Sequence, residues 1–172
     1  MHAQRWGAGL AIAAAVVAGG SVAAGAATTP PNVAYAGTVV AGPGAAVAKI
    51  TYTCHTAPGA VSHLFVAVKQ GPQVDTDAHS SSQYAQTFFS TNWKSDAGPN
   101  APRCDGVQHT QSVVLKPQPG FEAAAPRLHS GPALVQLCLY DNVTQFGEEG
   151  PLDGGFAASY TMEQVHAGNG QG

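Results

Sequence analysis

The segment that decides the fold is residues 133–140, which read Ala-Leu-Val-Gln-Leu-Cys-Leu-Tyr. Successive side chains of a β-strand point to opposite faces of the sheet. Apolar side chains occupy both alternating sets of positions here, and only Gln136 interrupts them. Burial on both faces is typical of a strand in the middle of a sheet whose two faces are covered. The segment therefore predicts a central strand.

Alternation with a period of two residues recurs on both sides of this segment. In residues 48–54, for example, Ile50, Tyr52 and Cys54 share one face of the expected strand. The polar residues of its opposite face are Lys49, Thr51 and Thr53. No segment after Val33 has the 3.6-residue period of an amphipathic helix. The other expected strands are residues 33–40, 63–70, 83–90, 107–116 and 155–165.

Glycine and proline separate all of these segments, as in Gly42-Pro43-Gly44 and Gly150-Pro151. About seven short strands with turns between them predict an all-β fold, an immunoglobulin-like antiparallel β-sandwich that follows an N-terminal signal helix. A small barrel is the alternative. The turn at residues 57–60 predicts that strands 48–54 and 63–70 form a hairpin.

Composition excludes several classes of protein. Only 10% of the 172 residues are charged, and the formal net charge is -3. A nucleic-acid binder needs clustered cations, and a charge-driven disordered chain needs a high net charge with low hydrophobicity. The 21 glycines and 12 prolines argue against a helical bundle.

The first 26 residues have the three regions of a secretory signal peptide. Arg5 provides the positive charge, residues 10–18 are an uninterrupted apolar run, and Ala24-Gly25-Ala26 fits the cleavage pattern of small residues. We therefore expect a secreted or extracellular protein, with no membrane span after cleavage. Residues 27–166 would form one domain, and residues 167–172 a flexible tail.

Three cysteines in an oxidising compartment allow three single-bridge pairings. We favour Cys54–Cys104, which closes a loop of about 50 residues and leaves Cys138 as a free core thiol. The alternative is Cys54–Cys138, which would resemble the bridge between the two sheets of antibody domains. Leu137 and Leu139 flank Cys138, so we expect a raised pKa and low reactivity for its thiol.

Several short motifs resemble those of a group of small secreted actinobacterial proteins. The motifs are the strand that ends at Cys54, the sequence Val68-Lys69-Gln70, and Cys104-Asp105-Gly106 followed by His109. The resemblance covers residues 33–165. It implies an immunoglobulin-like domain with a disulfide between Cys54 and Cys104, and it carries no catalytic residues.

Asp75, Asp77 and His79 form a candidate metal site. Their alternate positions would place two carboxylates and an imidazole on one face of an extended segment. The segment lacks the Gly and Glu of a calcium loop, and a solvated loop is the other interpretation. We predict no cofactor, and the histidines of the mature chain are expected at the surface or at strand ends.

Phe89 and Trp93 form a candidate binding surface. Phe88 and Phe89 are adjacent, so a strand would point them to opposite faces, and Trp93 follows among polar residues. An exposed aromatic side chain there would stack on a sugar or anchor a protein; packing in the core is the other interpretation.

Three functions follow from these patterns. The first is a secreted, non-catalytic module that contacts a protein, the envelope or a glycan, because the sequence has no Gly-x-Ser-x-Gly motif or other nucleophile site. The second is a small-molecule carrier resembling the enediyne-binding apoproteins of the neocarzinostatin type, whose two disulfides three cysteines cannot supply. The third is a metal-dependent enzyme that uses Asp75, Asp77 and His79.

Overall fold

The computed structural model describes residues 30–42, 44–56, 58–92, 98–119, 127–143, 146–147, 150–151 and 157–167. The strands are β1 (Asn32–Gly42), β2 (Ala45–His55), β3 (Ser62–Gln70), β4 (Thr87–Ser90), β5 (Asp105–Pro117), β6 (Gly131–Asp141), β7 (Phe146–Gly147), β8 (Gly150–Pro151) and β9 (Ala157–Ala167). The helices are α1 (Ala78–Tyr84) and the 3-10 turn η1 (Gly98–Asn100). The signal segment and the tail beyond Ala167 lie outside the described residues.

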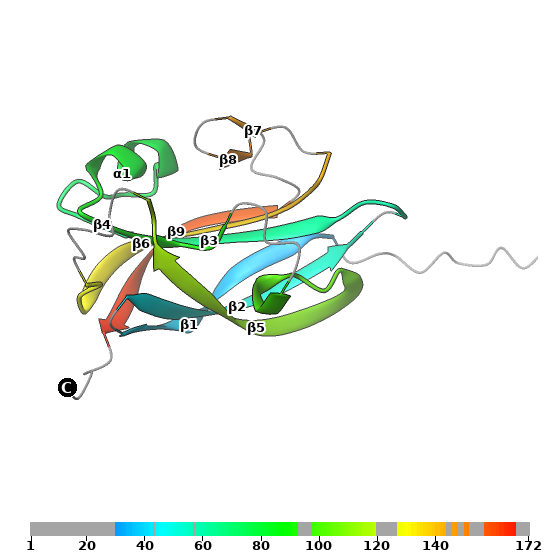
Figure 1. Ribbon diagram of the computed structural model, residues 1–172, viewed down its shortest axis with the longest axis horizontal. Helices are drawn as coiled ribbons and strands as arrows, with labels where there is room; N and C mark the ends of the chain where they lie inside the picture. Colours follow the sequence, from blue (N-terminus) through cyan, green and yellow to red (C-terminus); the bar gives the residue numbers. More distant parts are fainter. Residues whose placement is uncertain are drawn as a thin grey trace, which may run out of the picture.

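Seven strands form two layers that join at both edges (Figure 1). The hydrogen bonding of the strands closes on itself as a barrel in the order β1-β2-β5-β4-β3-β6-β9, so the barrel alternative from the sequence describes the connectivity of the two layers. Strands β1, β2 and β5 make the first layer, and β4, β3, β6 and β9 make the second. At one edge the end of β5 pairs with β4, and at the other β9 pairs in parallel with β1 at Val40 and Ala41. All the other pairings are antiparallel, so the prediction of an all-β antiparallel fold of about seven strands is confirmed.

Strand β6 is central, as its sequence predicts. It pairs with β3 on one side and with β9 on the other. Residues 133–140 are between 0% and 2% exposed. Their inward side chains meet the first layer, and their outward side chains are buried as well.

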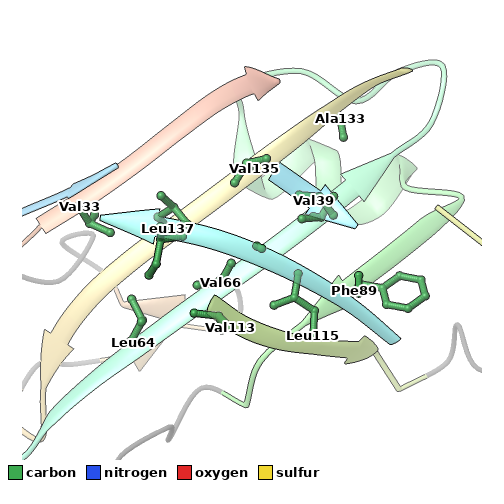
Figure 2. Close-up of a cluster of buried hydrophobic side chains, with 14 of the residues drawn as sticks. Val33, Val39, Leu64, Val66, Phe89, Val113, Leu115, Ala133, Val135 and Leu137 are labelled. Atoms are coloured by element: carbon green, nitrogen blue, oxygen red, sulfur yellow. The ribbon is translucent and has the colours of Figure 1, made fainter. Parts of the chain in front are cut away.

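Inward side chains of both layers fill the space between them (Figure 2). The cluster includes Ile50 and Tyr52 of β2, Leu64 and Val66 of β3, and Val113 of β5. Each of these side chains is at most 2% exposed. At about 25 cal/mol per Å² of apolar area, this burial is the main favourable contribution to folding.

The predicted hairpin of residues 48–54 with 63–70 is wrong. Strand β2 pairs with β1 and β5, whereas β3 pairs with β4 and β6. The turn after β2 therefore carries the chain from one layer to the other. This crossing places the apolar faces of both strands against each other across the core, where each is fully buried.

The predicted strand over residues 83–90 is only partly correct. Its first residues belong to α1, and β4 begins at Thr87. Asp77 caps this helix, because its Oδ1 accepts hydrogen bonds from the backbone N–H groups of His79 and Ser80 at 2.9 and 3.1 Å. An N-cap aspartate satisfies backbone donors that otherwise have no partner, and this local signal decides the conformation of the segment.

A disulfide joins Cys54, near the end of β2, to Cys104, just before β5. This is the pairing that we favoured from the sequence. Cys138 is a buried free thiol. It points away from the core on β6, whereas Cys54 points into the core, so the alternative bridge between Cys54 and Cys138 has no geometric basis.

Removing the disulfide should destabilise the domain strongly. The cysteines are 50 residues apart, and closing a loop of that length in the unfolded chain stabilises the native state by about 4 kcal/mol in the chain-entropy model. We expect the Cys54→Ala, Cys104→Ala double variant to lose about that amount in urea denaturation. Cys138→Ala, the matched control, should lose only about 1 kcal/mol. Equal losses would contradict the assignment.

Candidate functional site

The outward face of the second layer is covered. We call it the covered face, and it consists of His63, Phe65, Ala67 and Lys69 on β3 and Leu134, Gln136, Cys138 and Tyr140 on β6. None of these side chains is more than 6% exposed. Helix α1 and the pair β7–β8 lie on this side of the layer (Figure 1).

Lys69 attaches α1 to the covered face. Its Nζ donates hydrogen bonds to the backbone oxygen of Ala78, at 2.9 Å, and to Ser82 Oγ. The same ammonium lies 4.7 Å from the centre of the Phe88 ring, within the range of a cation–π contact. A buried charge is tolerated only when it is hydrogen-bonded or paired, and α1 provides acceptors for it.

Cys138 lies on the covered face as an unreactive thiol. Burial raises the pKa of this thiol, as its sequence predicts. Tyr160 Oη is 3.6 Å from the sulfur, and Gln136 Nε2 is 3.8 Å from it. Burial also raises the pKa of the Tyr160 hydroxyl. Neither group ionises readily, so this part of the face is suited to packing rather than to nucleophilic chemistry.

His63 lies at a strand end, as the sequence predicts, because it is the second residue of β3, but it is buried. It is 6% exposed, and its ring stacks on Tyr140 with 5.1 Å between the ring centres. The alternation of β3 required an outward position for His63, but the sequence does not show that this face is covered.

The outward face of the first layer is open. We call it the open face, and it consists of Val47, Lys49 and Thr51 on β2 and Thr110, Ser112, Val114 and Lys116 on β5. Val47 lies opposite Val114, Lys49 opposite Ser112, and Thr51 opposite Thr110. The two valines are 37% and 40% exposed, and the side chain of Asn100 in η1 exchanges hydrogen bonds with the backbone N–H and C=O of Val114 at 3.1 and 3.0 Å.

The end of the first layer near the disulfide is held by a hydrogen-bond network. Tyr52 Oη donates to Gln111 Oε1 at 2.8 Å and accepts from the backbone N–H of Arg103 at 3.0 Å. Gln111 Nε2 in turn donates to the backbone oxygen of Pro99 at 2.8 Å. These bonds fix the segment that leads into Cys104.

Asp105 and His109 are hydrogen-bonded to each other beside this network. His109 Nε2 donates to Asp105 Oδ1 at 2.7 Å. This hydrogen bond, followed by one from the backbone N–H of Val107, holds the pKa of the Asp105 carboxyl below its ordinary value. The His109 ring packs against Tyr52 with 5.6 Å between ring centres, and the Arg103 guanidinium is 3.5 Å from Asp105.

Among the residues that the structure describes, the Asp105–His109 pair has no third catalytic partner. In hydrolases, such a pair activates a hydroxyl or thiol within hydrogen-bond reach of the imidazole. Within the described residues, no hydroxyl or thiol makes a hydrogen bond to the His109 ring. The pair therefore connects two residues at the start of β5, where the register with β2 is irregular.

Asp75, Asp77 and His79 do not form a metal site in the structure. Asp77 Oδ1 caps α1, and Asp75 Oδ1 accepts from the Asp77 backbone N–H at 2.8 Å. No group of three or more potential metal ligands occurs in the described ranges of the chain. The spacing that suggested a metal site reflects the capping of a helix.

The candidate surface of Phe89 and Trp93 is wrong for Phe89. Phe89 lies opposite Val68 and points into the core, where it is 4% exposed. Its neighbour Phe88 points to the covered face and is also buried. The sequence predicted that the two rings point in opposite directions, but it did not predict that Phe88, on the outward side, is also buried. Trp93 lies outside the described residues.

The sequence did not reveal that the outward residues of β2 and β5 form one surface, the open face. The polar side of residues 48–54 was visible in the alternation, but its pairing with β5 is a contact between segments about 60 residues apart. The polar residues at alternate positions, Gln108, Thr110 and Ser112, were the available signal in β5.

Comparisons of the chain with protein-family models, with curated protein sequences and with solved structures find no match. Among the described residues, no helix has the length and apolar character needed to cross a membrane.

Acid should weaken the Asp105–His109 pair. A carboxyl with a lowered pKa binds fewer protons in the folded than in the unfolded state, so its stabilising effect is present at neutral pH and is lost as the pH falls below about 4. We expect the ¹³C titration midpoint of Asp105 below the ordinary value in the wild type and closer to it in His109→Ala. An unchanged midpoint would contradict the role of His109.

The Cys138 thiol should resist modification while the protein is folded. We expect a thiol-specific disulfide reagent at pH 8 to react at least about 100-fold more slowly with the native protein than with a free thiol. In guanidinium chloride, one equivalent should react, and in Cys138→Ala none. Rapid labelling of the native wild type would contradict its burial.

Proposed function

We propose that the protein is a secreted, non-catalytic β-sandwich module that acts by contact between its open face and an extracellular protein, envelope or glycan partner. The difference between the two faces carries this proposal. The covered face is closed by elements of the chain itself, whereas the open face presents two valines and a set of hydroxyl groups to the outside.

Secretion is part of the proposal. The signal pattern of residues 1–26 supports it, and so does the disulfide between Cys54 and Cys104. Disulfides persist in oxidising compartments and are rare where thiols are kept reduced.

An immunoglobulin-like topology is also part of the proposal. Two features of the strand order support this proposal: β1, β2 and β5 are neighbours, as strands A, B and E are in that fold, and β3, β6 and β9 are neighbours, as C, F and G are. The position of the disulfide differs from that of antibody domains, because it joins β2 to the segment before β5. The resemblance to small secreted actinobacterial proteins agrees with this topology.

The two other functions draw less support. A carrier would need space for a ligand between the layers, where the inward side chains of the described strands form one packed cluster. A metal-dependent enzyme would need Asp75 and Asp77 as ligands, but their Oδ1 atoms accept backbone hydrogen bonds.

Binding to bacterial cell walls tests the contact role. Fluorescently labelled mature protein should sediment with purified, insoluble walls. The Thr110→Glu, Ser112→Glu double variant should bind at least about tenfold more weakly, because it places two charges at the contact that must be desolvated. Thr76→Glu with Gln83→Glu makes the same charge change at exposed positions in and beside α1, and it should bind like the wild type.

Two results would overturn the contact role. In the first, the wild type sediments no more than an inert protein of similar charge. In the second, the two double variants bind equally. Melting temperatures of both variants establish that each is folded.

A further inference from the structure

Strand β9 has one hydrogen-bonded side and one free side. Toward β6 it pairs over Ala157–Val165 in nine consecutive pairs without a bulge. Toward β1 it pairs only at His166 and Ala167. On this second side, no group of the described residues bonds to the main chain of Ala157–Val165. Because the main-chain groups of a strand point alternately to its two sides, alternate residues of β9 carry unpaired donors and acceptors.

Strand β1 diverges from β9 along this side. Both of its halves, Asn32–Tyr35 and Val39–Gly42, pair with β2, and the register is irregular between them. Gly37 lies in the irregular part with a φ of 96°, a left-handed conformation that glycine adopts without strain. Only the second half of β1 pairs with β9. We call the free side of Ala157–Val165, with the facing edge of Asn32–Tyr35, the seam.

Elsewhere the chain closes its strand edges with side chains. On β5, Asn100 binds the backbone N–H and C=O of Val114. On β3, Thr91 Oγ1 accepts a hydrogen bond from the backbone N–H of Val66 at 3.0 Å. Natural sheets also protect their edges with lysine, proline or bulges, and β9 has none of these. The seam is therefore a long and regular strand edge that the described part of the chain leaves available.

The inward side chains of β9 cover the core incompletely along the seam. The inward residues of β6 beside them are fully buried. Those of β9 are only half-buried, and they are Ala157, Ser159, Thr161 and Glu163. Thr161 Oγ1 has no hydrogen-bond partner in the structure. Burial raises the pKa of the Tyr35 hydroxyl, and the Glu163 carboxylate adds to this effect, so these two side chains lie near each other across the seam.

We propose that the seam binds an extended, basic segment of a partner protein, which adds to the free side of β9 as a further strand. Unpaired main-chain donors and acceptors select such a segment, because another extended main chain offers partners at the same spacing. Glu163 has no ion pair among the described residues. An inward charge opposes pairing with an arbitrary strand, so the partner must place a lysine or arginine beside it.

The position of β1 decides between a peptide and a second copy of the chain. Strand β1 follows β9 in the closed strand order, so it stands on the far side of the seam. A single extended chain can reach the free side of β9 there, whereas the sheet edge of a second folded copy meets β1 first. The seam is separate from the open face, and its role does not depend on the role of that face.

A nine-residue peptide of alternating valine and threonine, with one central lysine, is the probe for this proposal. In the free protein, amide hydrogen exchange measured by NMR should be fast at alternate residues of Ala157–Val165 and slow at the residues between them. Saturating peptide should slow the fast set at least about tenfold. The Thr110→Glu, Ser112→Glu variant should bind the peptide like the wild type, because its changes lie on the open face.

Two N-methylated forms of the peptide test the main-chain pairing itself. Methyl groups remove the N–H donors of the odd-numbered residues in one form and of the even-numbered residues in the other. A strand at a sheet edge pairs along one of its sides. One form should therefore bind like the parent peptide, and the other at least about tenfold more weakly. This test needs no variant of the protein, so it does not depend on how a variant folds.

The charge of the partner is tested at Glu163. Glu163→Gln should weaken binding of the lysine peptide about twofold to fivefold. It should leave unchanged the binding of a peptide with glutamine in place of lysine. Gln164→Ala changes the neighbouring residue, which is exposed on the opposite face of β9, and it should alter the affinity less than twofold.

Several outcomes would overturn the proposal. They are no saturable binding, protection outside β9 only, equal binding of the two N-methylated forms, or equal losses of both peptides in Glu163→Gln. Slow exchange at every β9 amide of the free protein would also overturn it. In that case the edge is already occupied, by a second copy if size-exclusion chromatography shows a dimer and by the chain itself if it shows a monomer.

Discussion

The burial of β6 on both faces is the constraint on which the rest of the structure depends. Its inward side chains require a second layer, which β1, β2 and β5 provide. Its outward side chains require a cover, and α1 lies on that side. A sheet with apolar residues on both faces is stable only when both are removed from water. The first layer carries no such requirement, since the outward residues of β2 and β5 are mostly polar.

Lys69 shows how this cover is fixed in place. A short helix has little stability of its own, and α1 has only 7 residues. Its attachment depends on a cation that cannot be buried without acceptors, and the acceptors lie on the helix. The cost of burying an ammonium group therefore couples the helix to the sheet: displacement of α1 removes the two hydrogen bonds that Lys69 donates to Ala78 and Ser82.

Local patterns predicted the strands well and their partners poorly. Residues 133–140 and 48–54 were correctly assigned, with the right side chains inward, because period-two alternation depends only on the chain itself. The hairpin of β2 with β3 was wrong because neighbouring strands can belong to different layers. The prediction that Phe89 is exposed was wrong for a related reason. Alternation shows that Phe88 and Phe89 point to opposite faces of the strand, but only the packing of the whole domain shows that both faces are covered. The pairing of Cys54 with Cys104 could be predicted from the sequence, because Cys54 lies at the end of a strand and Cys104 lies just before another.

Closure of the two layers at β5–β4 and at β9–β1 has a consequence for how copies of the chain meet each other. Unpaired strand edges are templates for pairing with another chain, and long flat edges promote aggregation. Here β4 is covered by β5, and the end of β1 is held by β9. Each closure involves two residue pairs, and on the β5 edge the Asn100 side chain also binds the backbone N–H and C=O of Val114. At these positions the main chain is already hydrogen-bonded, so another molecule meets side chains there and cannot extend the sheet.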